Sequence, residues 1–172
     1  NESVRGFLKK YSDGAIVSHT VNIIGMGESS VAEEIEDMFD AKNPTVAPYA
    51  KSGEVRLRIT AKAETADDAD KMCAPVVDEI CSRLGDVVYG TDMNSIEERV
   101  VALLKEKGKK IATAESCTAG YIPKRLTDIP GASEVFECGI VSYSNDIKTK
   151  LLGVSPKTLE TYGAVSERTA RE

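Results

Sequence analysis

Three residues in the second half of the sequence have the types and spacing of a hydrolytic centre. Ser133 follows a Pro-Gly turn, Tyr143 ends an apolar run, and Lys148 begins the segment after it. A serine hydroxyl becomes a strong nucleophile only when a base accepts its proton. The sequence has a single histidine, so the other available bases are a carboxylate, a tyrosinate and a lysine in its neutral form. A Ser–Lys pair is therefore chemically available, although both residue types are also common in loops.

A second candidate lies where a strand-like run passes through a turn into a helix-like run, over residues 111–126. The turn carries the hydroxyls of Ser116 and Thr118 and ends at Gly120. Backbone N–H groups at the start of such a helix attract anions at the carboxyl edge of the strand. Small residues up to Gly120 let a ligand approach closely. By themselves, Ser116 and Thr118 are explained slightly better as helix caps than as ligand contacts.

Other motifs favour structural roles. Residues 25–30 (GMGESS) resemble the dinucleotide fingerprint, but Ser30 replaces the third glycine and Glu28 places a negative charge where a pyrophosphate would lie. We therefore expect a tight turn there. The four cysteines have no CxxC spacing, and His19 lies in an apolar strand-like run, so neither a zinc site nor a cofactor is expected.

Composition narrows the classes of protein. The chain has 172 residues, of which 41% are hydrophobic and 29% charged, with a net charge of −6. It can bury a core, and it has neither a signal pattern nor an apolar run of the ~18–20 residues that a membrane helix needs. We expect a soluble, cytoplasmic protein with no membrane partner. The acidic excess lies in residues 1–92 and disfavours nucleic acid as a partner.

Residues 14–92 predict an α+β sandwich with both helices on one face of the sheet. The strict alternation of apolar and polar residues over 55–61 is typical of a half-buried strand. The expected order is a strand at 14–24, a helix at 28–39, strands at 44–49 and 55–61 joined through Ser52 and Gly53, a helix at 65–84 and a strand at 87–89.

Residues 93–172 predict a parallel α/β unit, with a domain boundary near residue 92. A capping box at Ser95 opens a helix that Gly108 ends, followed by a strand at 111–114, a helix at 118–126 and a strand at 139–143. The sequence stops where a further helix begins, near residue 167. We therefore expect a truncated domain whose uncovered apolar faces favour self-association.

Several motifs together resemble the competence/damage-inducible CinA family. In the second part these are residues 115–120 (ESCTAG), 129–133 (IPGAS), 143–154 (YSNDIKTKLLGV) and 163–167 (GAVSE). In the first part they are residues 27–29, 43–51 and 58–63. The resemblance implies a remnant of an N-terminal domain at 1–13, a KH-type α+β linker module at 14–92, and the first half of the C-terminal deamidase domain at 93–172.

The implied activity is that of a nicotinamide-nucleotide amidohydrolase. Nicotinamide mononucleotide and water would give nicotinic acid mononucleotide and ammonia, a step of pyridine nucleotide salvage. By the resemblance, Ser133 matches the nucleophile, Lys148 its base and Tyr143 a supporting hydroxyl. Ser116, Thr118 and Gly120 match the turn where we place the phosphate or ribose of the substrate, and Ser116 is an alternative nucleophile.

Two further functions stay open at this stage. The chain could be a non-catalytic assembly or linker module of a CinA homo-oligomer, which the resemblance makes the expected assembly. Nucleic-acid binding is suggested by the KH-like order of elements, but the acidic first part and the absence of a GxxG clamp speak against it. Because part of the domain is expected to be missing, little or no deamidase activity is expected from the chain alone.

Overall fold

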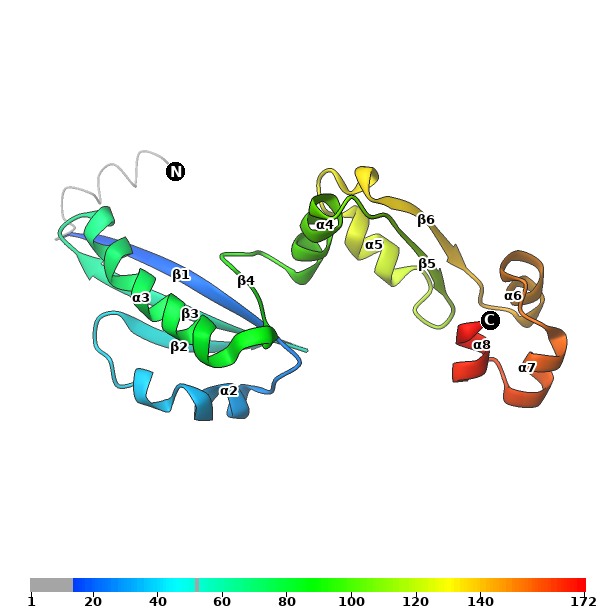
Figure 1. Ribbon diagram of the computed structural model, residues 1–172, viewed down its shortest axis with the longest axis horizontal. Coiled ribbons are helices and arrows are strands. Elements are labelled where there is room, and N and C mark those ends of the chain that lie inside the picture. The colour runs from blue at the N-terminus through cyan, green and yellow to red at the C-terminus, as the bar shows by residue number, and fades with distance from the viewer. Residues whose placement is uncertain (1–13, 52) are drawn as a thin grey trace. The chain divides into compact units, whose positions relative to one another are not determined.

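The computed structural model describes residues 14–51 and 53–172 (Figure 1). The expected remnant at residues 1–13, and Ser52 of the hairpin turn, lie outside the described residues. The chain divides into two compact units, of which the first ends at Ile96 and the second spans Glu97–Glu172. This division lies four residues beyond the predicted boundary near residue 92, because the segment after the last strand of the first unit packs on that unit: Arg56 donates hydrogen bonds to the carbonyls of Met93 and Asn94.

The first unit is a four-stranded antiparallel sheet with helices on one face, as predicted. The strand order is β2-β3-β1-β4. The strands are β1 (Ala15–Ile24), β2 (Thr45–Lys51), β3 (Glu54–Ala63) and β4 (Val88–Thr91), and the helices are α2 (Glu28–Glu34) and α3 (Ala66–Leu84). Figure 1 shows α3 lying along the sheet. The α+β class predicted for this part is confirmed.

Alternation in β3 decides which face is covered. Val55, Leu57 and Ile59 are buried and face the helices, whereas Arg58 and Lys62 are exposed on the other face. Helix α3 begins where the Thr65 side chain accepts a hydrogen bond from the Asp68 N–H, and it buries Ala69, Cys73, Ile80 and Leu84 against the sheet. This shared core holds the first unit together.

The His19 side chain of β1 contacts both α3 and the residue that follows β4. Its Nδ1 lies 2.7 Å from Asp92 Oδ2 and its Nε2 lies 2.8 Å from Asp70 Oδ1. Hydrogen bonds to Asp92 and to Asp70 raise the pKa of His19, which favours the charged imidazolium. Asp92 has a left-handed backbone with φ 54°, and its Oδ1 also accepts the Thr20 N–H at 2.7 Å. His19 therefore has a structural role, as the sequence predicted.

We expect the stability of the first unit to fall as the pH rises above about 6.5. The folded-state pKa of His19 is raised above its ordinary value of 6.5, so its contribution is complete below 6.5 and is lost as the pH rises through the higher value. Because both carboxylates are half-exposed, the contribution is on the order of 1 kcal/mol. Urea unfolding of the wild type and of His19→Gln between about pH 5 and 8 measures it. If the stability of both proteins had the same pH dependence, His19 would not be its cause.

The second unit is built on two parallel strands, β5 (Ile111–Glu115) and β6 (Phe136–Val141). Its helices are α4 (Ile96–Glu106), α5 (Tyr121–Thr127), α6 (Asn145–Leu152), α7 (Pro156–Tyr162) and α8 (Glu167–Arg171). A small core is formed by Val101 of α4, Leu126 of α5, Ala132 and Val135. Ile111 of β5 and Phe136 of β6 pack against it. The predicted parallel α/β class is confirmed. Strand β6 begins three residues before the predicted strand, and α6 was not predicted.

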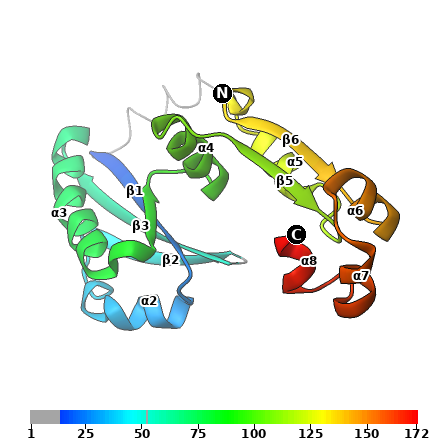
Figure 2. The ribbon, with the colours of Figure 1, turned by 45° about the vertical axis from the view of Figure 1, so that its right-hand side comes forward.

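The parallel pairing brings the carboxyl ends of β5 and β6 to the same edge. Figure 2 shows α6, α7 and α8 gathered beyond that edge, where both arrowheads point. Residues that follow the two strands therefore meet there, although they are far apart in the sequence.

Gly139 of β6 lies directly beneath α5, so a larger residue should destabilise the second unit. A Cβ at this position would lie 3.0 Å from carbons of Pro123 and 3.1 Å from Thr113 Oγ1. We expect Gly139→Val to lower the free energy of unfolding by about 1–3 kcal/mol through overpacking. Cys138→Val, at the exposed neighbouring position of the same strand, is the control in urea titration. Equal stability of the two variants would show that α5 adjusts without cost.

Candidate active site

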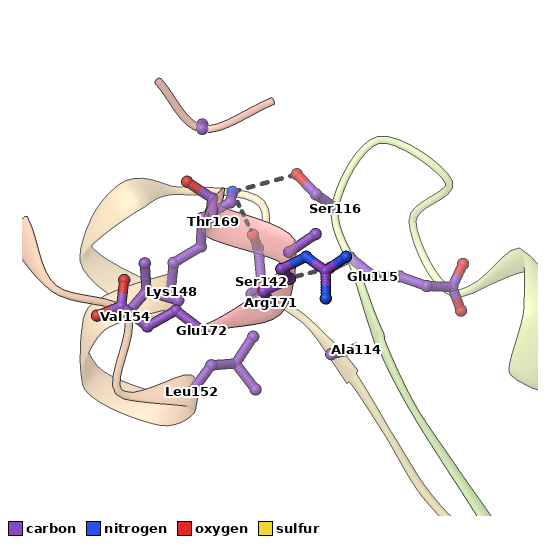
Figure 3. A pocket seen from close by; sticks show the side chains of 12 residues that line it. Ala114, Glu115, Ser116, Ser142, Lys148, Leu152, Val154, Thr169, Arg171 and Glu172 are labelled. Carbon is purple, nitrogen blue, oxygen red and sulfur yellow. Dashed lines mark hydrogen bonds between the residues drawn. The ribbon is translucent and has the colours of Figure 1, made fainter. Parts of the chain in front are cut away.

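Lys148 is a buried lysine at the centre of the edge where the strands end. It lies on α6 with 4% of its surface exposed. Helix α6 is started by Ser144, whose Oγ accepts the Ile147 N–H at 3.3 Å. The Lys148 Nζ donates hydrogen bonds to the carbonyl oxygens of Ser142 at 2.7 Å and Tyr143 at 3.0 Å, and it lies 3.1 Å from Ser116 Oγ (Figure 3).

This arrangement gives the Lys148 amine two carbonyl acceptors and one hydroxyl partner. Two N–H bonds are used by the carbonyls, and the third direction points to Ser116 Oγ. In a neutral amine that direction holds the lone pair, which can accept a hydroxyl proton. Within the described ranges, Nζ forms no ion pair with a carboxylate. The geometry is that of a nucleophile beside its base.

Two residues that the sequence analysis did not single out hold this geometry. Ser142 follows β6 and is buried, and both its N–H and its Oγ donate to the carbonyl oxygen of Glu115, at 2.7 and 3.1 Å. Glu115 is the last residue of β5 and is also buried. The predicted parallel pairing of the two strands could have identified both residues. In a parallel pair, the residues at the carboxyl ends of the two strands are neighbours.

A cavity opens beside the Lys148 amine. Its volume is about 360 Å³, within the range of about 300–1,000 Å³ typical of small-molecule sites. Ser116, Ser142 and Lys148 line one part of it, and residues of α8, including Thr169 and Arg171, line another (Figure 3). The lining thus combines hydroxyl groups with two cationic residues and two acidic residues, Glu115 and Glu172.

Ser133 is not brought to Lys148. It lies in the short turn Ala132–Glu134, before β6 begins, whereas Lys148 follows the end of that strand. A strand of six residues spans roughly 20 Å at about 3.3 Å per residue, so the two residues lie at opposite edges of the sheet. The expected convergence of Ser133 and Lys148 is wrong, and Ser116 lies beside the amine instead.

The other predicted site residues lie around the cavity rather than in it. The Tyr143 side chain is 74% exposed, and only its main-chain carbonyl contacts Lys148, so the expected contribution of its hydroxyl is not found in this geometry. Thr118 is exposed and does not line the cavity. Gly120 caps α5 in a left-handed conformation, φ 90°, that favours glycine. Substrate binding by Thr118 and Gly120 stays a prediction.

The turn after Ser116 carries candidate hydrogen-bond donors. Ala119 has the left-handed φ of 52°, and its N–H binds the Ser116 carbonyl at 3.1 Å. In the part of the chain that the structure describes, the N–H groups of Cys117 and Thr118 have no partner. Such groups next to a nucleophile suit an oxygen that becomes negative during attack.

Among residues 14–51 and 53–172, no group of three or more His, Cys, Asp or Glu side chains could hold a metal ion. None of the described helices has the length and apolarity needed to cross a bilayer.

Comparison with known proteins matches both units to one family. Residues 93–172 match the CinA C-terminal domain, and residues 18–90 match the damage-inducible protein CinA KH domain. A relative from Clostridium beijerinckii, named as a competence-damage inducible protein, is 56% identical over 99% of this chain. A CinA-like protein from Desulfovibrio desulfuricans is 48% identical over 99% of the chain.

These curated relatives are longer than this chain, which covers 42% of the first and 40% of the second. The solved structure of competence/damage inducible protein CihA from Agrobacterium tumefaciens is 45% identical, with a TM-score of 0.44, over 44% of this chain and 46% of that one.

Proposed function

Since the chain belongs to the CinA family, by the match of both its units to domains of that family, we propose that its second unit hydrolyses the amide of a nicotinamide nucleotide. The substrate is nicotinamide mononucleotide, and the products are nicotinic acid mononucleotide and ammonia. One observation supports hydrolysis by a serine nucleophile: the buried Lys148 Nζ lies 3.1 Å from Ser116 Oγ. The same amine donates hydrogen bonds to two main-chain carbonyls.

Ser116 acts as the nucleophile and Lys148 as its base. The neutral amine accepts the hydroxyl proton while Oγ forms a bond to the amide carbon, whose oxygen becomes negative. The N–H groups of Cys117 and Thr118 are the candidates that stabilise this oxygen. The Lys148 ammonium then gives its proton to the leaving nitrogen, the C–N bond breaks, and ammonia departs. Water, activated by the same amine, hydrolyses the acyl ester and restores Ser116.

The choice of a nucleotide as substrate comes from the family resemblance. Two cationic residues, Lys148 and Arg171, and two acidic residues, Glu115 and Glu172, line the cavity, so an anionic group would have to lie on the side of the cations. Arg171 also pairs with Glu167 at 2.7 Å, and this pair would rearrange to bind a phosphate.

The test is ammonia release from nicotinamide mononucleotide by this chain and by its longer relative from Clostridium beijerinckii. Mass spectrometry of the product should show nicotinic acid mononucleotide. Nicotinamide riboside, which lacks the phosphate, should be a poorer substrate. If neither protein releases ammonia while circular dichroism shows a folded state, the proposed activity is wrong.

An assembly role is the second candidate. Large apolar side chains are exposed in the second unit, among them Val165 at 95% and Leu151 at 60%, and such surface favours association. A chain that forms homo-oligomers in sedimentation velocity but releases no ammonia would favour this alternative. The predicted homo-oligomer is compatible with both functions.

A further inference from the structure

Glu115 carries an unsatisfied buried oxygen next to the proposed nucleophile. The residue is 6% exposed at the end of β5. Its Oε2 accepts the Ile122 N–H, in the first turn of α5, at 3.3 Å. Its Oε1 is fully buried and has no hydrogen-bond partner among the described residues. Figure 3 shows the carboxylate pointing away from Ser116 and Lys148, so it does not act on the substrate directly.

This carboxylate is unfavourable for folding. Its Oε1 lacks a hydrogen-bond donor among the described residues, and a buried oxygen without a donor is less stable than an apolar group of the same size. An apolar side chain at this position would fill the space beneath α5 without the penalty. The stability of the fold therefore does not explain a glutamate here.

Glu115 is linked by hydrogen bonds to Ser142, through Ser142 to the Lys148 amine, and to the start of α5. Its main-chain carbonyl accepts both donors of Ser142, whose own carbonyl holds the Lys148 amine. Its side chain holds the start of α5, which is the far end of the turn that begins at Ser116. The turn contains Ala119 in a left-handed conformation, which an L-residue rarely adopts unless both ends are fixed.

We propose that Glu115 is a positioning residue that holds the turn so that Ser116 Oγ stays within reach of Lys148 Nζ, at the cost of folding stability. It acts through the hydrogen bond that its carboxylate accepts from the Ile122 N–H. This inference rests on the proposed function of Ser116 as the nucleophile.

The experiment measures nucleophilicity and stability in the same proteins. A fluorophosphonate probe reports the nucleophile: Ser116 Oγ forms a bond to phosphorus, fluoride leaves, and Lys148 takes the proton. Mass spectrometry locates the adduct. Glu115→Met keeps the volume and removes both oxygens, and Glu115→Gln keeps one acceptor for Ile122. We expect labelling to slow about 10- to 100-fold in Glu115→Met, while its melting temperature is unchanged or higher.

Glu115→Gln should label at close to the wild-type rate. Thr113→Val is the matched control, because Thr113 lies on the same face of β5 and its Oγ1 is also buried without a partner. This variant should hold or raise the melting temperature and leave labelling unchanged.

The outcomes separate this inference from the proposed function. If the wild type is not labelled at Ser116, or if Lys148→Met is labelled as fast, the proposed nucleophile is wrong and the positioning role falls with it. If wild-type labelling depends on Lys148 but Glu115→Met keeps the full rate, only the positioning role is overturned. Loss of rate and melting temperature together in Glu115→Met, or a Glu115→Gln variant as slow as Glu115→Met, also overturns it.

Discussion

Replacing Ser116 with alanine is expected to abolish whatever ammonia release from nicotinamide mononucleotide the wild-type chain shows, with kcat falling by a factor of up to about 10⁴. Ser116 Oγ is the hydroxyl that contacts the Lys148 amine, so its loss removes the acyl-enzyme route. Substrate binding should change little, because the cavity keeps Lys148 and Arg171. Steady-state kinetics of ammonia release should therefore show a loss in kcat with a similar KM.

Ser133→Ala is the matched control for this prediction. Ser133 is exposed in the turn before β6, at the other edge of the sheet from Lys148. We expect its replacement to leave kcat close to that of the wild type. The reverse result, with Ser133→Ala inactive and Ser116→Ala active, would contradict the assignment of the nucleophile.

Replacing Lys148 with methionine is expected to lower kcat about 10³-fold and to destabilise the second unit. Methionine fills the apolar path of the side chain but cannot take the proton of Ser116. It also leaves the carbonyls of Ser142 and Tyr143 without their donor, and a buried acceptor without a partner costs about 1–3 kcal/mol. Ammonia release and urea unfolding measure the two effects.

Two variants control for this result. Lys148→Arg keeps the donors to the carbonyls but should not recover activity, because a guanidinium does not lose its proton in proteins. Lys150→Met, on the exposed side of the same helix, should leave kcat and stability unchanged. An active Lys148→Arg would show that charge, rather than proton transfer, is what the reaction needs at this position.

Local patterns in the sequence predict the classes of both units and most of their helices and strands. Alternation over residues 55–61 predicted β3, and Thr65 with Gly85 marked the two ends of α3. These patterns are local: period-two burial and end caps act within a few residues, so they can be read before the chain is folded. The same local logic placed a strand, a turn with Ser116, and a helix over residues 111–126.

Tertiary structure alone decided which serine meets Lys148. Ser133 is nearer to Lys148 in the sequence, whereas Ser116 is 32 residues away. The parallel register of β5 and β6 places residues after both strands at one edge, and it sends Ser133, which precedes β6, to the other edge. Glu115 and Ser142 became site residues for the same reason. Contacts across a parallel pair depend on register and direction, which local patterns do not encode.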